Sequence, residues 1–92
     1  MIFYLNSGQN RVWYRAKGFQ SGLSVQVRLV GPDFGEYVLI DLTEWKSEGM
    51  YWFIFDFDKP GTWLGIIYED GEKATSNTFH IDTIPGVVTH TN

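Results

Sequence analysis

Residues 49–71, GMYWFIFDFDKPGTWLGIIYEDG, give the clearest indication of the architecture of this protein. From Tyr51 to Phe57, every second side chain is aromatic, which places four rings on one face of an extended chain. We expect this face to lie in the core, because so much adjacent aromatic surface is not left in contact with water. The run at 62–70, TWLGIIYED, is apolar on both faces. Both runs therefore predict β-strands.

The rest of the chain shows the same period of two. In LSVQVRLV, residues 23–30, apolar residues alternate with Ser24, Gln26 and Arg28, a pattern typical of a strand with one wet face. Turn signals such as GPDFG at residues 31–35 separate the runs. We expect strands at residues 2–6, 11–19, 23–30, 36–44, 50–58, 62–70 and 74–82. These predict an all-β fold, an antiparallel β-sandwich of about seven strands and of immunoglobulin-like or fibronectin-III-like type, with a small barrel as the alternative.

The chain of 92 residues provides one domain, which we place at residues 1–82. The remaining segment, TIPGVVTHTN at 83–92, contains Pro85 and Gly86, which interrupt a continuing strand. This segment is either a frayed terminus or an extended C-terminal arm whose Val87 and Val88 add as a strand to a neighbouring subunit. We expect no secretion signal and no membrane span, because the chain lacks a long apolar run.

Two successive strands are apolar on the faces that we do not assign to the core. Trp52 and Ile54 lie opposite the four rings of the first strand, and Trp63 and Ile66 lie on opposite faces of the second. This is more apolar surface than the core of one small sandwich needs, and exposed apolar patches mark contacts with partners. We therefore predict an interface at Trp52, Ile54, Trp63 and Ile66, extended by the two valines of the arm.

Charge is divided unevenly along the chain, whose formal net charge is −4. Residues 1–32 contain four basic residues and no acidic one, a net charge of +4, whereas residues 33–92 contain eleven acidic residues and three lysines, a net charge of −8. One interpretation is ion pairing between neighbouring strands. The other is a basic edge that meets the acidic edge of a second copy or of a larger partner. The acidic total argues against a nucleic-acid partner.

Residues suited to catalysis or metal binding are few. The chain has no cysteine, and His80 and His90 are its only histidines, neither of them in a recognisable nucleophile or phosphate-loop motif. Asp56 and Asp58 fall on one face of a predicted strand, where paired carboxylates could transfer protons or bind calcium. A further acidic group, Glu69, Asp70 and Glu72, is typical of a solvated hairpin that blocks edge-to-edge aggregation. We therefore predict no enzymatic activity, no cofactor and no metal.

The four tryptophans allow a different kind of site. Trp13, Trp45, Trp52 and Trp63 could stack on sugar rings, as exposed tryptophans do in carbohydrate-binding sandwiches. Half-buried tryptophans of this kind are also common in the walls of a β-core. A module that binds carbohydrate or a host surface is therefore the alternative hypothesis for function, with a surface glycan as partner.

Residues 22–73 resemble a small β-sandwich segment of tailed-bacteriophage structural proteins. The shared elements are a G-L-x-V-x-V-R strand, a D-L-T-E-x-x-x-x-G-x-Y turn, a G-T-W strand start and a Y-E-D-G hairpin. The resemblance implies a virion component assembled in the host cytoplasm: a capsid decoration protein, or a part of the collar, tail or baseplate. It also implies that the partners are other virion proteins, in a homo-oligomer or on the capsid or tail, and it brings no active-site residues.

Overall fold

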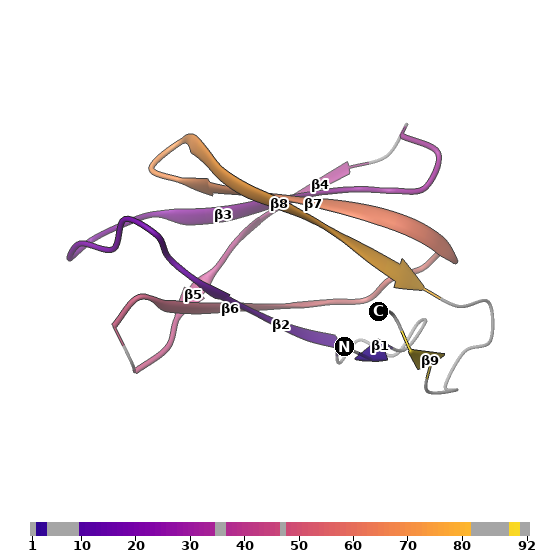
Figure 1. The fold of residues 1–92 in the computed structure, drawn as a ribbon, viewed down its shortest axis with the longest axis horizontal. Coiled ribbons are helices and arrows are strands. Elements are labelled where there is room, and N and C mark those ends of the chain that lie inside the picture. Colours follow the sequence, from indigo (N-terminus) through magenta and orange to yellow (C-terminus); the bar gives the residue numbers. More distant parts are fainter. Residues whose placement is uncertain (1, 4–9, 35–36, 47, 82–88, 91–92) are drawn as a thin grey trace.

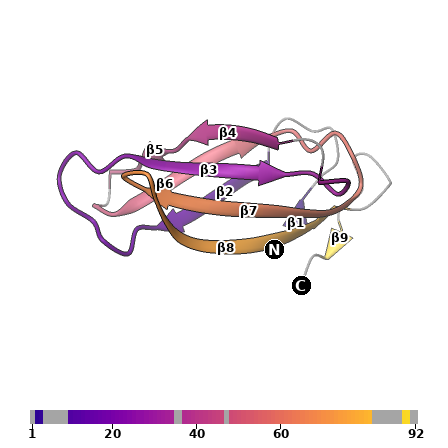
Figure 2. The same ribbon diagram turned by 90° about the horizontal axis from the view of Figure 1, so that it is seen from above.

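Two antiparallel sheets face each other in the computed structural model, which describes residues 2–3, 10–34, 37–46, 48–81 and 89–90 (Figure 1). The first sheet has the order β4-β3-β7-β8, best seen in Figure 2. Its strands are β3 (Val25–Val30), β4 (Tyr37–Asp41), β7 (Gly61–Glu69) and β8 (Glu72–Ile81). The second sheet has the order β2-β6-β5, with β2 (Asn10–Arg15), β5 (Thr43–Glu44) and β6 (Met50–Phe55).

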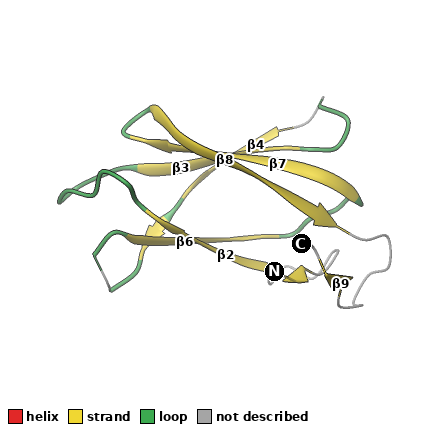
Figure 3. Cartoon of the chain, in the orientation of Figure 1, coloured by secondary structure: helices red, strands yellow, loops and turns green. Residues whose placement is uncertain are grey.

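This arrangement confirms the all-β prediction. Seven strands form the two antiparallel sheets, as expected for a β-sandwich, and Figure 3 shows no helix in the part of the chain that the structure describes. The immunoglobulin-like or fibronectin-III-like type stays a prediction.

A small third element lies at one side of the three-stranded sheet (Figure 1). The strands β1 (Ile2–Phe3) and β9 (Thr89–His90) pair antiparallel, with Ile2 opposite His90 and Phe3 opposite Thr89. Two residues of the predicted arm are thus paired with the start of the chain. Val87 and Val88 lie outside the described residues, so the strand addition predicted for them stays a prediction.

The predicted strand at 36–44 divides between the two sheets, which the sequence did not indicate. β4 pairs with β3 in one sheet, whereas β5 pairs with β6 in the other. Between them, the side chain of Leu42 is buried, and its N–H donates to the carbonyl oxygen of Val25 over 2.9 Å. Because Leu42 continues the apolar alternation of its neighbours, the sequence pattern alone does not show that the chain changes sheets here.

The core lies between the sheets and follows the predicted alternation. In β3, Val25, Val27 and Leu29 are buried while the residues between them are half-buried. The largest fully buried side chain is Phe57, which follows β6 and fills the space between the sheets at one end. The ring of Phe79 lies close against Gly65 of the neighbouring strand β7. This packing requires glycine, because a Cβ at residue 65 would lie 2.7 Å from Phe79 Cε2.

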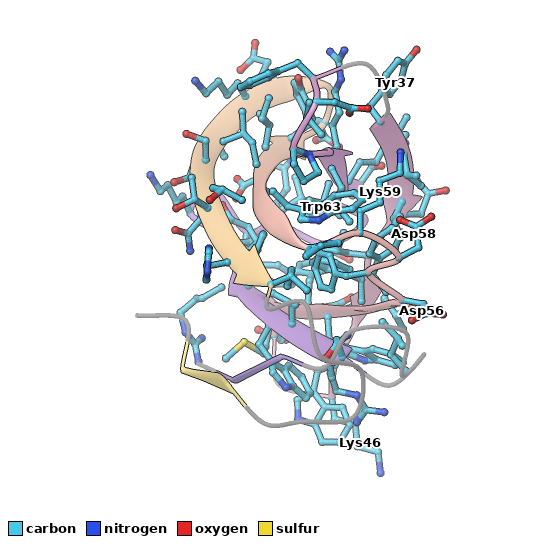
Figure 4. All side chains as sticks on the ribbon, turned by 90° about the vertical axis from the view of Figure 1, so that its right-hand side faces the viewer. Tyr37, Lys46, Asp56, Asp58, Lys59 and Trp63 are labelled. Atoms are coloured by element: carbon cyan, nitrogen blue, oxygen red, sulfur yellow. The ribbon has the colours of Figure 1, made fainter. Side chains whose placement is uncertain are left out.

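One end of the sandwich is closed by aromatic packing, and Figure 4 looks onto this end. The Phe57 ring packs edge-to-face on Phe55 and on Trp63, with centroid distances of 5.0 and 5.4 Å. The indole N–H of Trp63 donates to the carbonyl oxygen of Lys59 over 2.9 Å, which ties the loop to the ring cluster. We call Phe55, Phe57 and Trp63 the aromatic plug.

The other end is closed by carboxylates. Asp70 and Gly71 form the two-residue turn between β7 and β8, with φ angles of 51° and 85°, and an Asp-Gly pair is the sequence that such a tight hairpin favours. The preceding residue, Glu69, accepts hydrogen bonds from the loop after β2: from Lys17 N–H over 2.7 Å and from Gly18 N–H over 2.9 Å. It also accepts the hydroxyl of Tyr14 over 2.5 Å.

Asp70 extends this set. Its carboxylate accepts the N–H of Ser24 over 2.9 Å, while its own N–H donates to the Ser24 carbonyl over 2.8 Å. We call Glu69 and Asp70, with the backbone groups that they hold, the carboxylate clasp. The clasp fixes residues 17–24 to the β7–β8 hairpin, although some fifty residues separate the two segments in the chain.

Candidate interaction surface

The outer face of the three-stranded sheet is set by the pairing of β2 with β6. Directly opposed residues share a face, and the Val12–Phe53 pair is buried. The neighbouring pairs must therefore point outward, because side chains alternate along a strand. The outward pairs are Arg11–Ile54, Trp13–Trp52 and Arg15–Met50, and Thr43 of β5 lies opposite Trp52 on its other side.

Trp13 packs against two other tryptophans on this face. The rings of Trp13 and Trp45 meet edge-to-face with their centroids 5.4 Å apart, and Trp13 lies 6.3 Å from Trp52. Trp13 and Trp45 keep 39% and 44% of their surface exposed, and the adjacent Ile54 keeps 41%. We call Trp13, Trp45, Trp52, Ile54 and Arg11 the tryptophan face.

The tryptophan face is basic within an acidic protein. The guanidinium of Arg11 lies over the ring of Trp52, 4.6 Å from its centroid, and Arg15 occupies a further outward position. The outward positions of β2 and β6 contain two arginines and no carboxylate. A cation on an indole ring is favourable by about 0.5–1 kcal/mol when exposed. Among the described residues, no carboxylate lies within ion-pair distance of Arg11, so ion pairing between neighbouring strands, one of our two interpretations of the uneven charge, does not involve this arginine.

The structure separates the residues that we predicted as an interface. Trp52 and Ile54 lie side by side on the tryptophan face, whereas Ile66 is half-buried on the outer face of the other sheet. The prediction that Trp63 is available to a partner is wrong: only 2% of its surface is exposed, because it belongs to the aromatic plug. Figure 4 shows its ring inside the sandwich.

Trp13 and Trp45 were missing from the predicted interface. The sequence indicates each of them only as a candidate for sugar stacking, because neither belongs to a predicted strand that is apolar on both faces. Their proximity to Trp52 depends on the register of two sheet pairings. A signal that could have found Trp13 is its position in the middle of β2, which suits a cross-strand pair with Trp52.

The carboxylates that could transfer protons or bind calcium do not form a common site. Asp56 and Asp58 follow the end of β6 and are exposed, with the buried Phe57 between them, and Figure 4 shows them projecting from different points of the loop. His80 is exposed on β8. Among the described residues, no group of three or more His, Asp or Glu side chains is arranged to hold a metal ion.

Glu69 has a structural environment that the sequence did not reveal. Burial by itself would raise the pKa of Glu69, but the hydrogen bonds from the Tyr14 hydroxyl and from the Lys17 and Gly18 N–H groups outweigh burial and leave this pKa below its ordinary value. In turn, burial and the adjacent carboxylate raise the pKa of Tyr14 to about 12. Both shifts favour the charged carboxylate beside a neutral phenol. Glu69 is thus an ionised anchor of the loop rather than a solvated hairpin acid.

Comparisons with known proteins identify no relative: no family model, no curated protein and no solved structure matches this chain. In the described part of the chain, no helix has the length and apolar character needed to cross a membrane.

Proposed function

We propose that this protein is a non-catalytic binding module that contacts another protein through the tryptophan face. The observation that carries the proposal is the packing of Trp13 against Trp45 and Trp52, three rings that stay part-exposed beside Ile54. Tryptophan and arginine are the residues that most often dominate the binding energy of protein interfaces. Rings that already pack on their neighbours also lose little conformational freedom on binding.

The proposed partner class comes from the sequence resemblance. We propose a structural or accessory subunit of a bacteriophage virion, in capsid decoration or in the collar, tail or baseplate. Its partners would be further copies or other virion proteins, and assembly would take place in the host cytoplasm. The basic, aromatic character of the tryptophan face suits an acidic protein surface.

The test of this proposal measures association directly. Sedimentation velocity of the full chain over a range of concentrations would show self-association, and co-sedimentation with assembled capsids or tails would show binding to them. We expect association in at least one assay, and we expect Trp13→Ser to weaken it about tenfold or more, as for a central interface tryptophan.

The matched control is Phe34→Ser. Phe34 is an exposed aromatic residue, with 80% of its surface accessible, and it lies in the loop after β3 rather than on the tryptophan face. Association should be unchanged in this variant. A chain that stays monomeric and binds neither capsids nor tails would contradict the proposal, as would equal losses in the two variants.

Carbohydrate binding is the second candidate function, favoured by the exposed rings of Trp13 and Trp45. A glycan array probed with the full chain would test it. Stacking on a sugar predicts that Trp13→Ala and Trp45→Ala abolish glycan binding while the far-ultraviolet circular dichroism spectrum stays that of a folded β-protein. An array without a bound glycan would exclude this candidate.

A further inference from the structure

We propose that the outer face of the four-stranded sheet carries a second binding site, centred on Arg28, for an acidic side chain on a segment of a partner protein. This site lies on the opposite side of the sandwich from the tryptophan face, as the two layers of Figure 1 show, and its argument does not depend on the proposed function.

Arg28 stands in the middle of an apolar surface. It points outward from β3, since Val27 and Leu29 on either side of it are buried in the core. Its cross-strand partners are Leu39 of β4 and Ile66 of β7. The guanidinium lies over the ring of Tyr37, 4.4 Å from the ring centroid, so one side of this cation is already covered.

The charge of Arg28 is not compensated within the described part of the chain. Its Nε atom is buried and has no hydrogen-bond acceptor there, and no carboxylate lies within ion-pair distance. Asp41, on the neighbouring β4 position of the same face, accepts a hydrogen bond of 2.7 Å from Gln26. A cation partly removed from water without a counter-charge is unfavourable, and a carboxylate supplied by a partner would relieve this condition.

A shallow depression surrounds this arginine. It has a volume of about 320 Å³ and is lined by Gln26, Arg28, Tyr37, Leu39, Tyr68 and Gly71. The guanidinium fork matches the geometry of a carboxylate, and the amide and phenol groups of the lining can also donate hydrogen bonds. Tyr37 and Leu39 are exposed and apolar in large part, Tyr37 with 62% of its surface accessible. They would be covered by the residues beside the acidic side chain, which favours a protein segment over a free anion.

An array of random heptapeptides, probed with the labelled full chain, tests this inference. We expect the bound peptides to be enriched in Asp or Glu next to apolar residues. The tightest binder would then be compared with its analogue carrying Gln in place of Glu or Asn in place of Asp, by fluorescence anisotropy. The amide analogue should bind about tenfold more weakly or worse, because it loses a charge-assisted, bidentate contact.

Arg28→Gln in the protein should cause a similar loss, and Tyr37→Leu should cause a smaller one by removing the ring beneath the guanidinium. The matched control is Lys46→Gln, which removes the same charge at a residue on the opposite side of the molecule from Tyr37 (Figure 4). Binding should be unchanged in this control. Circular dichroism would check that each variant is folded.

Three results would overturn the inference. These are an array with no bound peptide, bound peptides without enrichment of acidic residues, and equal losses in Arg28→Gln and Lys46→Gln. Because none of these variants alters the tryptophan face, failure here would leave the association tests of that face unaffected.

Discussion

At one end of the sandwich two carboxylates hold a loop by hydrogen bonds, whereas at the other end a buried phenylalanine holds the loop by packing. The carboxylate clasp works through the backbone N–H groups of Lys17, Gly18 and Ser24. The aromatic plug works through ring contacts around Phe57, whose side chain is wholly buried. A small β-sandwich can therefore close its two ends by different interactions, and the clasp depends on the ionised carboxylate of Glu69.

The largest expected effect on stability comes from removing the buried ring of the aromatic plug. Phe57→Ala should lower the free energy of unfolding by about 3–5 kcal/mol, because it removes a buried ring and leaves a cavity. Urea unfolding followed by tryptophan fluorescence measures this change. Phe34→Ala, which truncates an exposed ring, should stay within about 0.5 kcal/mol of the wild type. Comparable losses in the two variants would show that Phe57 does not close the sandwich.

Weakening the carboxylate clasp should lower the free energy of unfolding by less than Phe57→Ala does. Glu69→Gln removes a charged acceptor from the Tyr14 hydroxyl and from the Lys17 and Gly18 N–H groups. We expect the free energy of unfolding at neutral pH to fall by about 1–3 kcal/mol. The neighbouring acid Glu72 is exposed, so Glu72→Gln is the matched control and should have little effect. If both variants lose the same stability, the hydrogen bonds to Glu69 do not hold the loop.

A fall in pH should weaken the carboxylate clasp and leave the packing of the aromatic plug unchanged. The pKa of Glu69 is lower in the folded chain than its ordinary value of about 4.3, so its contribution to stability is complete above that pH and is lost as the pH falls through the folded pKa. Between about pH 5 and pH 3, wild type and Phe57→Ala should therefore lose stability with similar slopes. Glu69→Gln should show a shallower slope over the same range, and identical slopes in all three proteins would contradict this prediction.

The smallest effect is expected from the ion pair at the plug end. Lys59 Nζ lies 3.8 Å from Asp33 Oδ2, and both side chains are exposed. Lys59→Gln should change the free energy of unfolding by about 0.5 kcal/mol or less, because exposed pairs contribute little. The Lys59 carbonyl that accepts the Trp63 indole N–H is unchanged by this substitution. A loss above about 1 kcal/mol would mean that charge also closes this end, and the difference between the ends would be smaller than we infer.

Local patterns were enough to predict an all-β sandwich of two antiparallel sheets, but not the change of sheet at Leu42. The period of two in β3 and β6 predicted the buried face of each strand, and the acidic group around Asp70 indicated a hairpin. In β7 the same alternation does not show which face lies in the core, because residues on both faces are apolar. Periodicity therefore could not place Trp63 in the core and Ile66 outside it.

The site was less accessible to sequence reasoning because it depends on pairing between distant segments. Trp13 and Trp52 meet only through the register of β2 with β6. Tyr14 and Glu69, 55 residues apart, form their hydrogen bond across the two sheets. The position of Trp13 within its strand suits a cross-strand pair but does not give the register, and nothing in the local sequence around Tyr14 or Glu69 indicates their hydrogen bond.

The chain passes directly from β4 in one sheet to β5 in the other, and this short connection couples the movements of the two sheets. Asp41 belongs to the layer that carries Arg28, Thr43 belongs to the layer that carries Trp52, and Leu42 is the one residue between them. Because the Leu42 side chain is buried and its N–H is bonded to β3, one layer cannot slide along the other without stretching this connection. A pulling force applied to one sheet would thus reach the other through a covalent path one residue long.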